Sequence, residues 1–206
     1  MVPHRLILAS ASPRRRLLLE KAGVTLGIYP VDINETHRAD ESPAIYVRRM
    51  AEEKMDAALQ ALREPPRRDE FDTLNNTLLT ADTIVTIDDL VLGKPISFDE
   101  ARSAWERLSG RTHAVITAFS LARGEPKYAN RHTQLVTTEV TFKNLTPAHM
   151  QAYWDTGEPL DKAGGYAIQG AAAEWVEQTS GSLNNVIGLP VAEVLKALDQ
   201  INRLDI

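Results

Sequence analysis

The stretch Leu6-Ile7-Leu8-Ala9-Ser10-Ala11-Ser12-Pro13-Arg14-Arg15-Arg16, near the start of the chain, decides the fold. Leu6 to Ala9 is a short apolar run, which is typical of a strand in the interior of a sheet. Ser12 can accept a hydrogen bond from the first turn of a helix. Pro13 suits the first helical position, because its missing N–H donor is not needed there. The stretch therefore predicts a buried strand whose carboxyl end leads directly into a helix.

The start of this helix has the chemistry of an anion-binding site. Free N–H groups and the positive end of the helix dipole favour phosphate at such a position. Ser10 precedes the helix, and Arg14 and Arg15 lie in its first turn, where two arginines oppose the dipole unless an anion pairs with them. We expect these three residues to bind phosphate. The alternative that the segment leaves open is a solvated basic turn without a ligand.

Composition limits the class of protein. The chain has 206 residues, of which 43% are hydrophobic and 25% charged, as in an ordinary globular protein. Its net charge of −5 disfavours a broad nucleic-acid-binding face and suits a compact anionic ligand held by a few cations. The absence of Cys excludes disulfides, thiolate zinc sites and a Cys nucleophile. Without a membrane-spanning run or a secretory signal pattern, we expect a cytoplasmic protein that binds neither membrane nor nucleic acid.

Signals for helices and strands continue along the chain. Ser42-Pro43 repeats the cap-and-proline start and opens a helix to about Leu62, and the capping box Ser97 to Glu100 opens another to Leu108. The segment Gly181 to Asn185 is interpreted as a polar turn. We expect one domain over residues 1–206. Its remaining elements are strands at 26–31, 78–87, 90–92, 112–121 and 134–142, and helices at 146–154 and from Pro190 onward.

Charged residues lie at positions where the surrounding pattern is apolar. Lys54 is in the apolar stripe of the long helix, and Asp82 interrupts the strand 78–87. A carboxylate among buried residues needs a partner, a metal or a raised pKa. Lys94, which follows the next hairpin, could reach back beside Asp82. The alternatives are that Lys54 snorkels past its neighbours and that Asp82 and Lys94 form a purely structural pair.

The segment Gly157 to Gly170 contains four glycines together with Asp161, Lys162 and Gln169. Glycine allows a backbone to approach a ligand closely, so the segment is a candidate binding loop. A flexible surface loop is the alternative.

Taken together, these segments closely resemble the Maf family of nucleoside triphosphate pyrophosphatases, and they follow the order of that family along nearly the whole chain. Thr80 departs from the Gly that many members have before Ala-Asp, and Leu183 departs from a common Tyr; both lie beside motifs rather than at their polar centres. The matching stretches are Ser10 to Arg15, Glu35, Lys54, Ala81 to Thr83, Gly93 to Pro95, Ser109 to His113, Glu158 to Gly164 and Asn185 to Pro190.

The resemblance implies an α/β fold: an elongated, twisted mixed sheet flanked by helices, with two lobes around a central cleft, similar to the inosine-triphosphatase-like group. It implies hydrolysis of a nucleoside triphosphate between the α and β phosphates, which yields the monophosphate and pyrophosphate and clears unwanted nucleotides from the pool. The resemblance is also compatible with a homodimer. The alternative function is a nucleotide-binding regulator of cell division without catalysis, against which the intact Asp82 argues.

By the same resemblance, Asp82 accepts a proton from the attacking water, and Glu35 holds a divalent ion or the same water. Since the chain lacks Cys and a His cluster, the expected cofactor is Mg²⁺ or Mn²⁺ held by these two carboxylates. The groups expected to bind and neutralise the triphosphate are Ser10, Arg14, Arg15, Lys54 and Lys94.

Three positions sort the substrates of the proteins that this chain resembles, and here they hold Arg14, Thr83 and Gln169. The branch that acts on 7-methylguanosine triphosphate carries an aromatic residue, a Gln and a Glu at these positions. A Gln side chain offers a donor and an acceptor, which match the O4 and N3–H edge shared by uracil and thymine. The resemblance therefore implies the dTTP/UTP pyrophosphatase branch.

Overall fold

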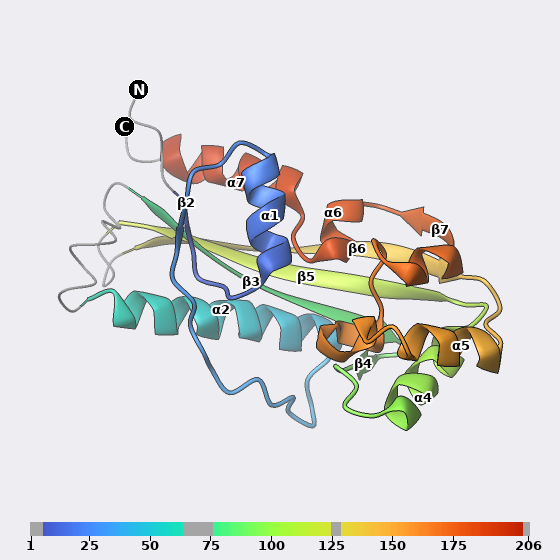
Figure 1. Cartoon of the computed structure of the whole chain (residues 1–206). Helices are drawn as coiled ribbons and strands as arrows, with labels where there is room; N and C mark the ends of the chain where they lie inside the picture. Colours follow the sequence, from blue (N-terminus) through green and yellow to red (C-terminus); the bar gives the residue numbers. More distant parts are fainter. Residues whose placement is uncertain (1–5, 64–75, 125–128, 204–206) are drawn as a thin grey trace.

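The computed structural model describes residues 6–63, 76–124 and 129–203, and a long, twisted, seven-stranded mixed sheet runs through it (Figure 1). The strand order is β2-β1-β3-β5-β6-β7, and β4 pairs with β3. β1 is parallel to β2 and β3, whereas the other pairs are antiparallel. The strands are β1 (Leu6–Leu8), β2 (Leu26–Ile28), β3 (Thr77–Ile87), β4 (Leu90–Leu92), β5 (Thr112–Arg123), β6 (Asn130–Phe142) and β7 (Val176–Ser180).

The predicted interior strand and the helix that follows it are confirmed. Leu6, Ile7 and Leu8 of β1 are at most 1% exposed, and β1 lies between β2 and β3. The helix α1 (Pro13–Lys21) starts after the carboxyl end of β1, and Ser12 Oγ accepts a hydrogen bond from the N–H of Arg15 at 3.4 Å. The cap and the proline thus place a helix N-terminus next to the middle of the sheet.

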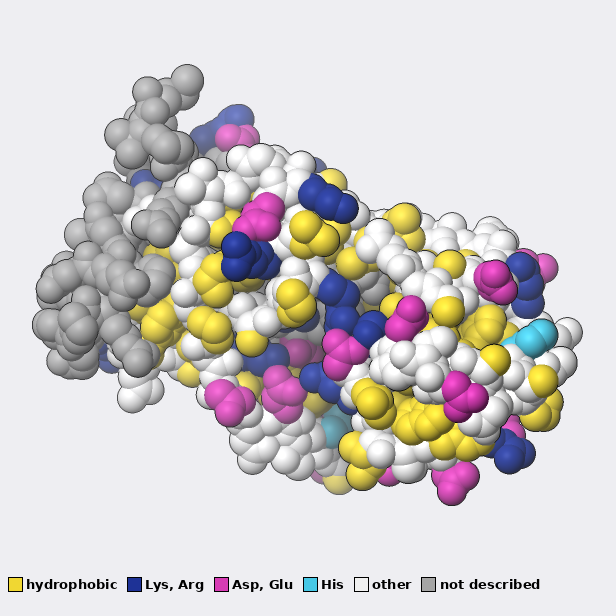
Figure 2. All heavy atoms as spheres, in the orientation of Figure 1, with side chains coloured by type: hydrophobic (Ala, Val, Ile, Leu, Met, Phe, Trp, Pro, Cys, Tyr) yellow, Lys and Arg dark blue, Asp and Glu magenta, His cyan; other side chains and the backbone are white. Residues whose placement is uncertain are grey.

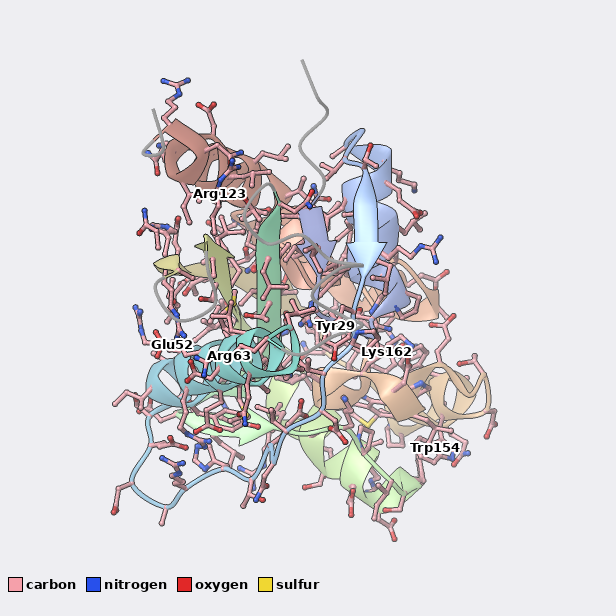
Figure 3. All side chains as sticks on the ribbon, turned by 90° about the vertical axis from the view of Figure 1, so that its left-hand side faces the viewer. Tyr29, Glu52, Arg63, Arg123, Trp154 and Lys162 are labelled. Carbon is pink, nitrogen blue, oxygen red and sulfur yellow. The ribbon has the colours of Figure 1, made fainter. Side chains whose placement is uncertain are left out.

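Helices cover both faces of the sheet, which explains why β1 is apolar on both sides (Figure 1). α2 (Pro43–Ala61) packs on the face of Ile7, while α1 and α7 (Val191–Arg203) pack on the face of Leu6 and Leu8. Arg123, at the end of β5, lies against α7 and donates to Oδ1 of Asn202 at 2.6 Å (Figure 3). The predicted apolar stripe of α2 is confirmed, with Val47, Met50, Ala51 and Ala58 fully buried.

A second group of elements covers the far end of the sheet and encloses an aromatic core around Trp105, Phe142, Tyr153 and Trp175. These elements are α4 (Phe98–Leu108), α5 (Pro147–Trp154) and the 3-10 helices η1 (Glu158–Asp161), η2 (Ala163–Gly165) and η3 (Ala171–Trp175). The two lobes expected from the sequence correspond to this aromatic core and to the cores that α1, α2 and α7 form on the other part of the sheet.

Several predicted boundaries are wrong. The second strand ends at Ile28 rather than Val31, because the chain leaves the sheet after Tyr29 donates to the carbonyl of Leu8 at 2.9 Å. The expected polar turn at 181–185 is instead the start of the short helix α6 (Leu183–Ile187), since Ser182 Oγ caps it by accepting from the N–H of Asn185. Among the described residues, no helix combines the length and the apolar character that crossing a bilayer requires.

Candidate active site

A cavity of about 690 Å³ opens between the two lobes, a volume in the range of small-ligand sites. Basic and acidic side chains gather around a hollow in the middle of this face (Figure 2). The carboxyl end of β1, the middle of β3 and the segment 161–169 contribute to its wall. All nine residues that the sequence nominated line it: Ser10, Arg14, Arg15, Glu35, Lys54, Asp82, Thr83, Lys94 and Gln169.

Lys54 forms a bridge between the two carboxylates of this cavity. Its Nζ lies 2.6 Å from Oε1 of Glu35 and 2.7 Å from Oδ1 of Asp82. The side chains of Lys54 and Asp82 are only 12% and 15% exposed, while that of Glu35 is 47% exposed. Burial acts to raise the pKa of Glu35, but the hydrogen bond and charge of Lys54 outweigh it and lower that pKa. Lys54 therefore does not snorkel to solvent.

Within the described residues, the lysine that pairs with Asp82 is Lys54 rather than Lys94. Lys94 follows β4 and is exposed, and within the described ranges no ion pair to it is found. It still lines the cavity and adds positive charge near Glu35. The two lysines thus differ in their surroundings: Lys54 is paired on the cavity wall, and Lys94 is exposed without an ion pair to the described residues.

A hydrogen bond from Thr80 joins β3 to α2 close to the contact between Lys54 and Asp82. Its hydroxyl donates to the carbonyl of Ala51 at 2.7 Å, and the residue is fully buried. The departure from Gly at this position therefore supplies a bond between strand and helix less than one turn from Lys54. Leu183, the other departure, is 49% exposed and does not line the cavity.

Arg15 is buried, and its guanidinium donates to four acceptors of the protein itself. Nη1 reaches the carbonyl of Ala81 at 2.7 Å and Oγ of Ser10 at 3.2 Å, Nε reaches the carbonyl of Gly188 at 2.9 Å, and Nη2 reaches Oγ1 of Thr83 at 3.2 Å. Burial lowers the pKa of Arg15, against the attraction of the nearby acids. The sequence pattern does not distinguish Arg14 from Arg15. In the structure, Arg15 links α1 to β3 and to the backbone at Gly188.

Arg14 also lines the cavity but is more accessible, with 38% of its side chain exposed. Its Nη1 lies 3.2 Å from Oδ2 of Asp161, and the same carboxylate pairs through Oδ1 with Lys162. Lys162, labelled in Figure 3, also donates to the carbonyl of Glu158 at 2.7 Å. The hydrogen bond from Lys162 lowers the pKa of Asp161. Lys162 is a cavity residue to which the sequence reasoning gave no role, although it lies in the matched stretch Glu158 to Gly164.

The glycine-rich segment is packed rather than loose. The N–H of Gly164 donates to the carbonyl of Gly93 at 2.9 Å, and a Cβ at Gly164 would lie 3.0 Å from the Val85 side chain. Gly164 also has a φ of +65°, which L side chains rarely adopt. Both observations contradict the flexible-loop alternative. The segment instead fixes Lys94 and Gln169 relative to the sheet.

The carboxylates fit a divalent ion that binds together with phosphate. Across the described ranges, no group of three or more His, Cys, Asp or Glu side chains could hold a metal by itself. Mg²⁺, however, often uses one or two carboxylates and takes its other ligands from substrate phosphates and water. Lys54 bonds one oxygen of each carboxylate, and no hydrogen bond from the described residues reaches Oδ2 of Asp82 or Oε2 of Glu35. These two oxygens are therefore open to a further ligand.

The fold and the cavity define an α/β protein with a site suited to a small polyphosphate. A sequence profile described as "Maf-like protein" matches residues 5–201, and the chain belongs to the Maf family. It is 44% identical over 198 residues to the dTTP/UTP pyrophosphatase of Pseudoalteromonas atlantica, covering 96% of this chain and 97% of that protein. Proteins of the same name from Syntrophus aciditrophicus and Alkalilimnicola ehrlichii are 43% and 41% identical, over 99% and 96% of this chain and 93% of each relative. The family inferred from the motifs is confirmed.

Proposed function

We propose that this protein is a dTTP/UTP pyrophosphatase that cleaves its substrate between the α and β phosphates, giving the nucleoside monophosphate and pyrophosphate. The observation that carries the proposal is the position of Lys54 between Glu35 and Asp82 on the wall of a cavity that cations surround. Near full-length similarity to relatives with that name supports the choice of substrates. One domain spanning residues 1–206 would carry the whole reaction.

Asp82 is the group that activates water in this proposal. Lys54 bonds Oδ1 and thereby fixes the orientation of the carboxylate, which leaves Oδ2 to accept a proton. Proton transfer to a positioned carboxylate contributes about 10²–10⁴-fold to the rate of such reactions. The water would attack the α phosphate, and the pyrophosphate would leave toward the cations at the opening.

In this proposal, two accessible cations, the N-terminus of α1 and the hydroxyl of Ser10 bind the phosphates. Arg14 and Lys94 are accessible at the cavity, and the N-terminus of α1 offers its free N–H groups. Ser10 Oγ accepts from the N–H of Ser12 and from Arg15, which leaves its own hydrogen to donate to a phosphate oxygen. Arg15 adds positive charge behind Ser10 and keeps that hydroxyl in place.

In this proposal Glu35 and Asp82 would hold the divalent ion, and Mg²⁺ and Mn²⁺ are the ions that suit hard oxygen ligands. Such an ion neutralises phosphate charge and makes a bound water more acidic. Without it, the two carboxylates would repel a triphosphate that approaches Lys54.

The base is read by Gln169 in this proposal. Its side chain is exposed on the cavity wall, and no hydrogen bond within the described residues occupies its amide. Thr83 acts less directly, because its hydroxyl contacts Oγ1 of Thr117 at 2.9 Å and the carbonyl of Gly188 at 3.1 Å. Thr83 therefore shapes the wall near the base, and Gln169 supplies the donor and acceptor for O4 and N3–H.

The test is product analysis with a panel of triphosphates: dTTP, UTP, dCTP, ATP, GTP and 7-methyl-GTP, each with Mg²⁺ or Mn²⁺. We expect dTTP and UTP to give monophosphate and pyrophosphate well ahead of the purine nucleotides. Release of inorganic phosphate with a nucleoside diphosphate would overturn the proposed cleavage position. Tight nucleotide binding without turnover would instead favour a regulator.

A further inference from the structure

The segment that carries Glu35 has neither helix nor strand. Between the end of β2 at Ile28 and the start of α2 at Pro43, the chain runs as an irregular loop, and Glu35 is in its middle. A side chain on such a loop can hold a fixed position only if the loop itself is anchored, because ordering it costs conformational entropy. The site therefore depends on what fastens this loop to the rest of the protein.

Arg49 of α2 makes several of the bonds that fasten this loop. Its Nη2 donates to the carbonyl of Thr36 at 3.0 Å and to Oε2 of Glu41 at 2.7 Å, and Nε also bonds the Glu41 carboxylate. Nη1 contacts the carboxylate of Glu53, one turn further along α2, at 3.3 Å. The Arg49 and Glu41 side chains are only 13% and 9% exposed, so this bidentate pair is shielded from water.

Tyr46 anchors the loop next to Arg49. Its hydroxyl donates to the backbone carbonyl of Glu35 at 2.8 Å, and its ring meets the ring of His37 edge-on at 4.9 Å. The Arg49 guanidinium lies 5.6 Å from the centre of the Tyr46 ring. Residues three or four positions apart lie on one face of a helix, so Tyr46 and Arg49 form a single contact surface for the loop.

We propose that Arg49, together with Tyr46, is a positioning residue that holds the Glu35 carboxylate against Lys54. α2 carries the two anchors and Lys54 itself, so one rigid helix sets both ends of the Glu35–Lys54 contact. The inference rests on the proposed function, and it assigns to Arg49 and Tyr46 a role in the reaction although no hydrogen bond or ion pair within the described residues joins either of them to Lys54 or Asp82.

The neighbouring Arg48 offers a matched control. It is on the same helix and is 48% exposed, and its one ion pair among the described residues is to Glu52, 3.7 Å away. It makes no hydrogen bond to the loop in the described part of the chain. Arg48→Met therefore removes the same charge and a similar side chain from the adjacent position without touching the anchor.

The experiment compares Arg49→Met, Arg49→Lys and Arg48→Met in the native and in the Glu35→Gln background. Loss of a residue that orients a metal-binding or catalytic group costs about 10–100-fold. We expect Arg49→Met to lower kcat/KM for dTTP by that amount in the native background and by less than about twofold when Glu35 is already Gln. Arg48→Met should leave both backgrounds unchanged. Arg49→Lys, which cannot form the bidentate pair, should resemble Arg49→Met.

Losses that multiply fully in the Arg49→Met, Glu35→Gln double variant would overturn the inference, since Arg49 would then act independently of Glu35. Tyr46→Phe provides a second variant if Arg49→Met does not fold, because it removes a single hydroxyl; it should show the same dependence on Glu35.

Amide hydrogen exchange gives a measurement without turnover. Exchange over residues 32–41 should accelerate in Arg49→Met and not in Arg48→Met. A parent protein that hydrolyses no triphosphate would contradict the proposed function, whereas unchanged exchange in Arg49→Met would contradict the anchor.

Discussion

Nζ of Lys54 lies 2.7 Å from Oδ1 of Asp82, a contact that joins the middle of α2 to the middle of β3. Each residue interrupts an apolar pattern, and each would be costly to bury alone. The ion pair between them compensates for the loss of water around both charges. Two charged groups can therefore lie on the wall of a cavity between two hydrophobic cores. The contact leaves the second oxygen of Asp82, Oδ2, free of hydrogen bonds within the described residues.

Asp82→Asn should abolish most turnover and leave the fold intact. An amide oxygen can still accept a hydrogen bond from Lys54, but an amide cannot accept a proton from water at neutral pH. We expect kcat for dTTP to fall by at least ~10²-fold. The free energy of unfolding in urea should stay within ~1 kcal/mol of the parent value. Near-normal turnover in this variant would rule out Asp82 as the base.

The variants Lys54→Met and Lys94→Met should differ in their effects on turnover and on stability. Lys54→Met leaves two carboxylates facing each other without a cation, so it should lose turnover and also ~2 kcal/mol of unfolding free energy. Lys94→Met removes an exposed charge without an ion pair among the described residues, so it should raise KM at unchanged stability. Steady-state kinetics and urea denaturation measure both effects. Equal stability losses in the two variants would contradict the difference in their environments.

Removal of divalent ions should abolish activity reversibly. The cavity wall contains the carboxylates of Asp32, Glu35, Asp82 and Asp161 as well as its cations, so a triphosphate meets repulsion near Lys54. Treatment with excess chelator, followed by dialysis, should eliminate pyrophosphate release from dTTP. Addition of Mg²⁺ or Mn²⁺ should restore it. Full activity after exhaustive chelation would contradict the metal assignment to Asp82 and Glu35.

His113 should make stability depend on pH. It is buried, its Nε2 lies 2.7 Å from the hydroxyl of Tyr166, and burial lowers its pKa to about 4. The unfolded chain, with an ordinary His pKa of about 6.5, binds the proton more readily than the folded chain. The stability contribution is therefore complete above pH ~6.5 and is lost as the pH falls toward 4, by up to ~3 kcal/mol.

A His113→Gln variant isolates this effect, because Gln can keep a hydrogen bond to Tyr166 and does not titrate. Carboxylates also titrate at low pH, so the informative quantity is the difference between the two proteins. Urea denaturation between pH 4.5 and 7 should give a shallower pH dependence for the variant. The same dependence in both proteins would show that His113 does not contribute.

Local sequence signals predicted the elements that build the cavity. The start of α1 was predictable from the capping residues Ser12 and Pro13, and the buried face of α2 from its apolar periodicity. Both signals come from residues close together in the sequence. The sequence does not predict β7, because it is a short strand with the polar sequence VEQTS, and β6 is its one partner strand among the described residues. A strand of this kind has no apolar alternation to detect.

The distinct roles of Arg14 and Arg15 could not be read from sequence. They are adjacent and identical, and only the packing of α1 against Ala81 and Gly188 decides that Arg15 is buried. The same holds for the partner of Asp82. Lys54 and Lys94 are both consistent with the spacing, and the bond from Thr80 to Ala51 sets the relation of helix to strand that favours Lys54.

Gln169→Glu should erode the preference for dTTP and UTP. The Gln169 amide is exposed on the cavity wall and is free of hydrogen bonds within the described residues, so it can offer both a donor and an acceptor to a base. A Glu at this position offers only acceptors, which mismatches O4 of uracil and thymine and suits the N–H edge of guanine. Loss of a matched hydrogen bond can discriminate by several powers of ten. The ratio of kcat/KM for dTTP to that for GTP and 7-methyl-GTP should therefore fall in the variant. A uniform decrease for all nucleotides would mean that Gln169 only braces the glycine segment.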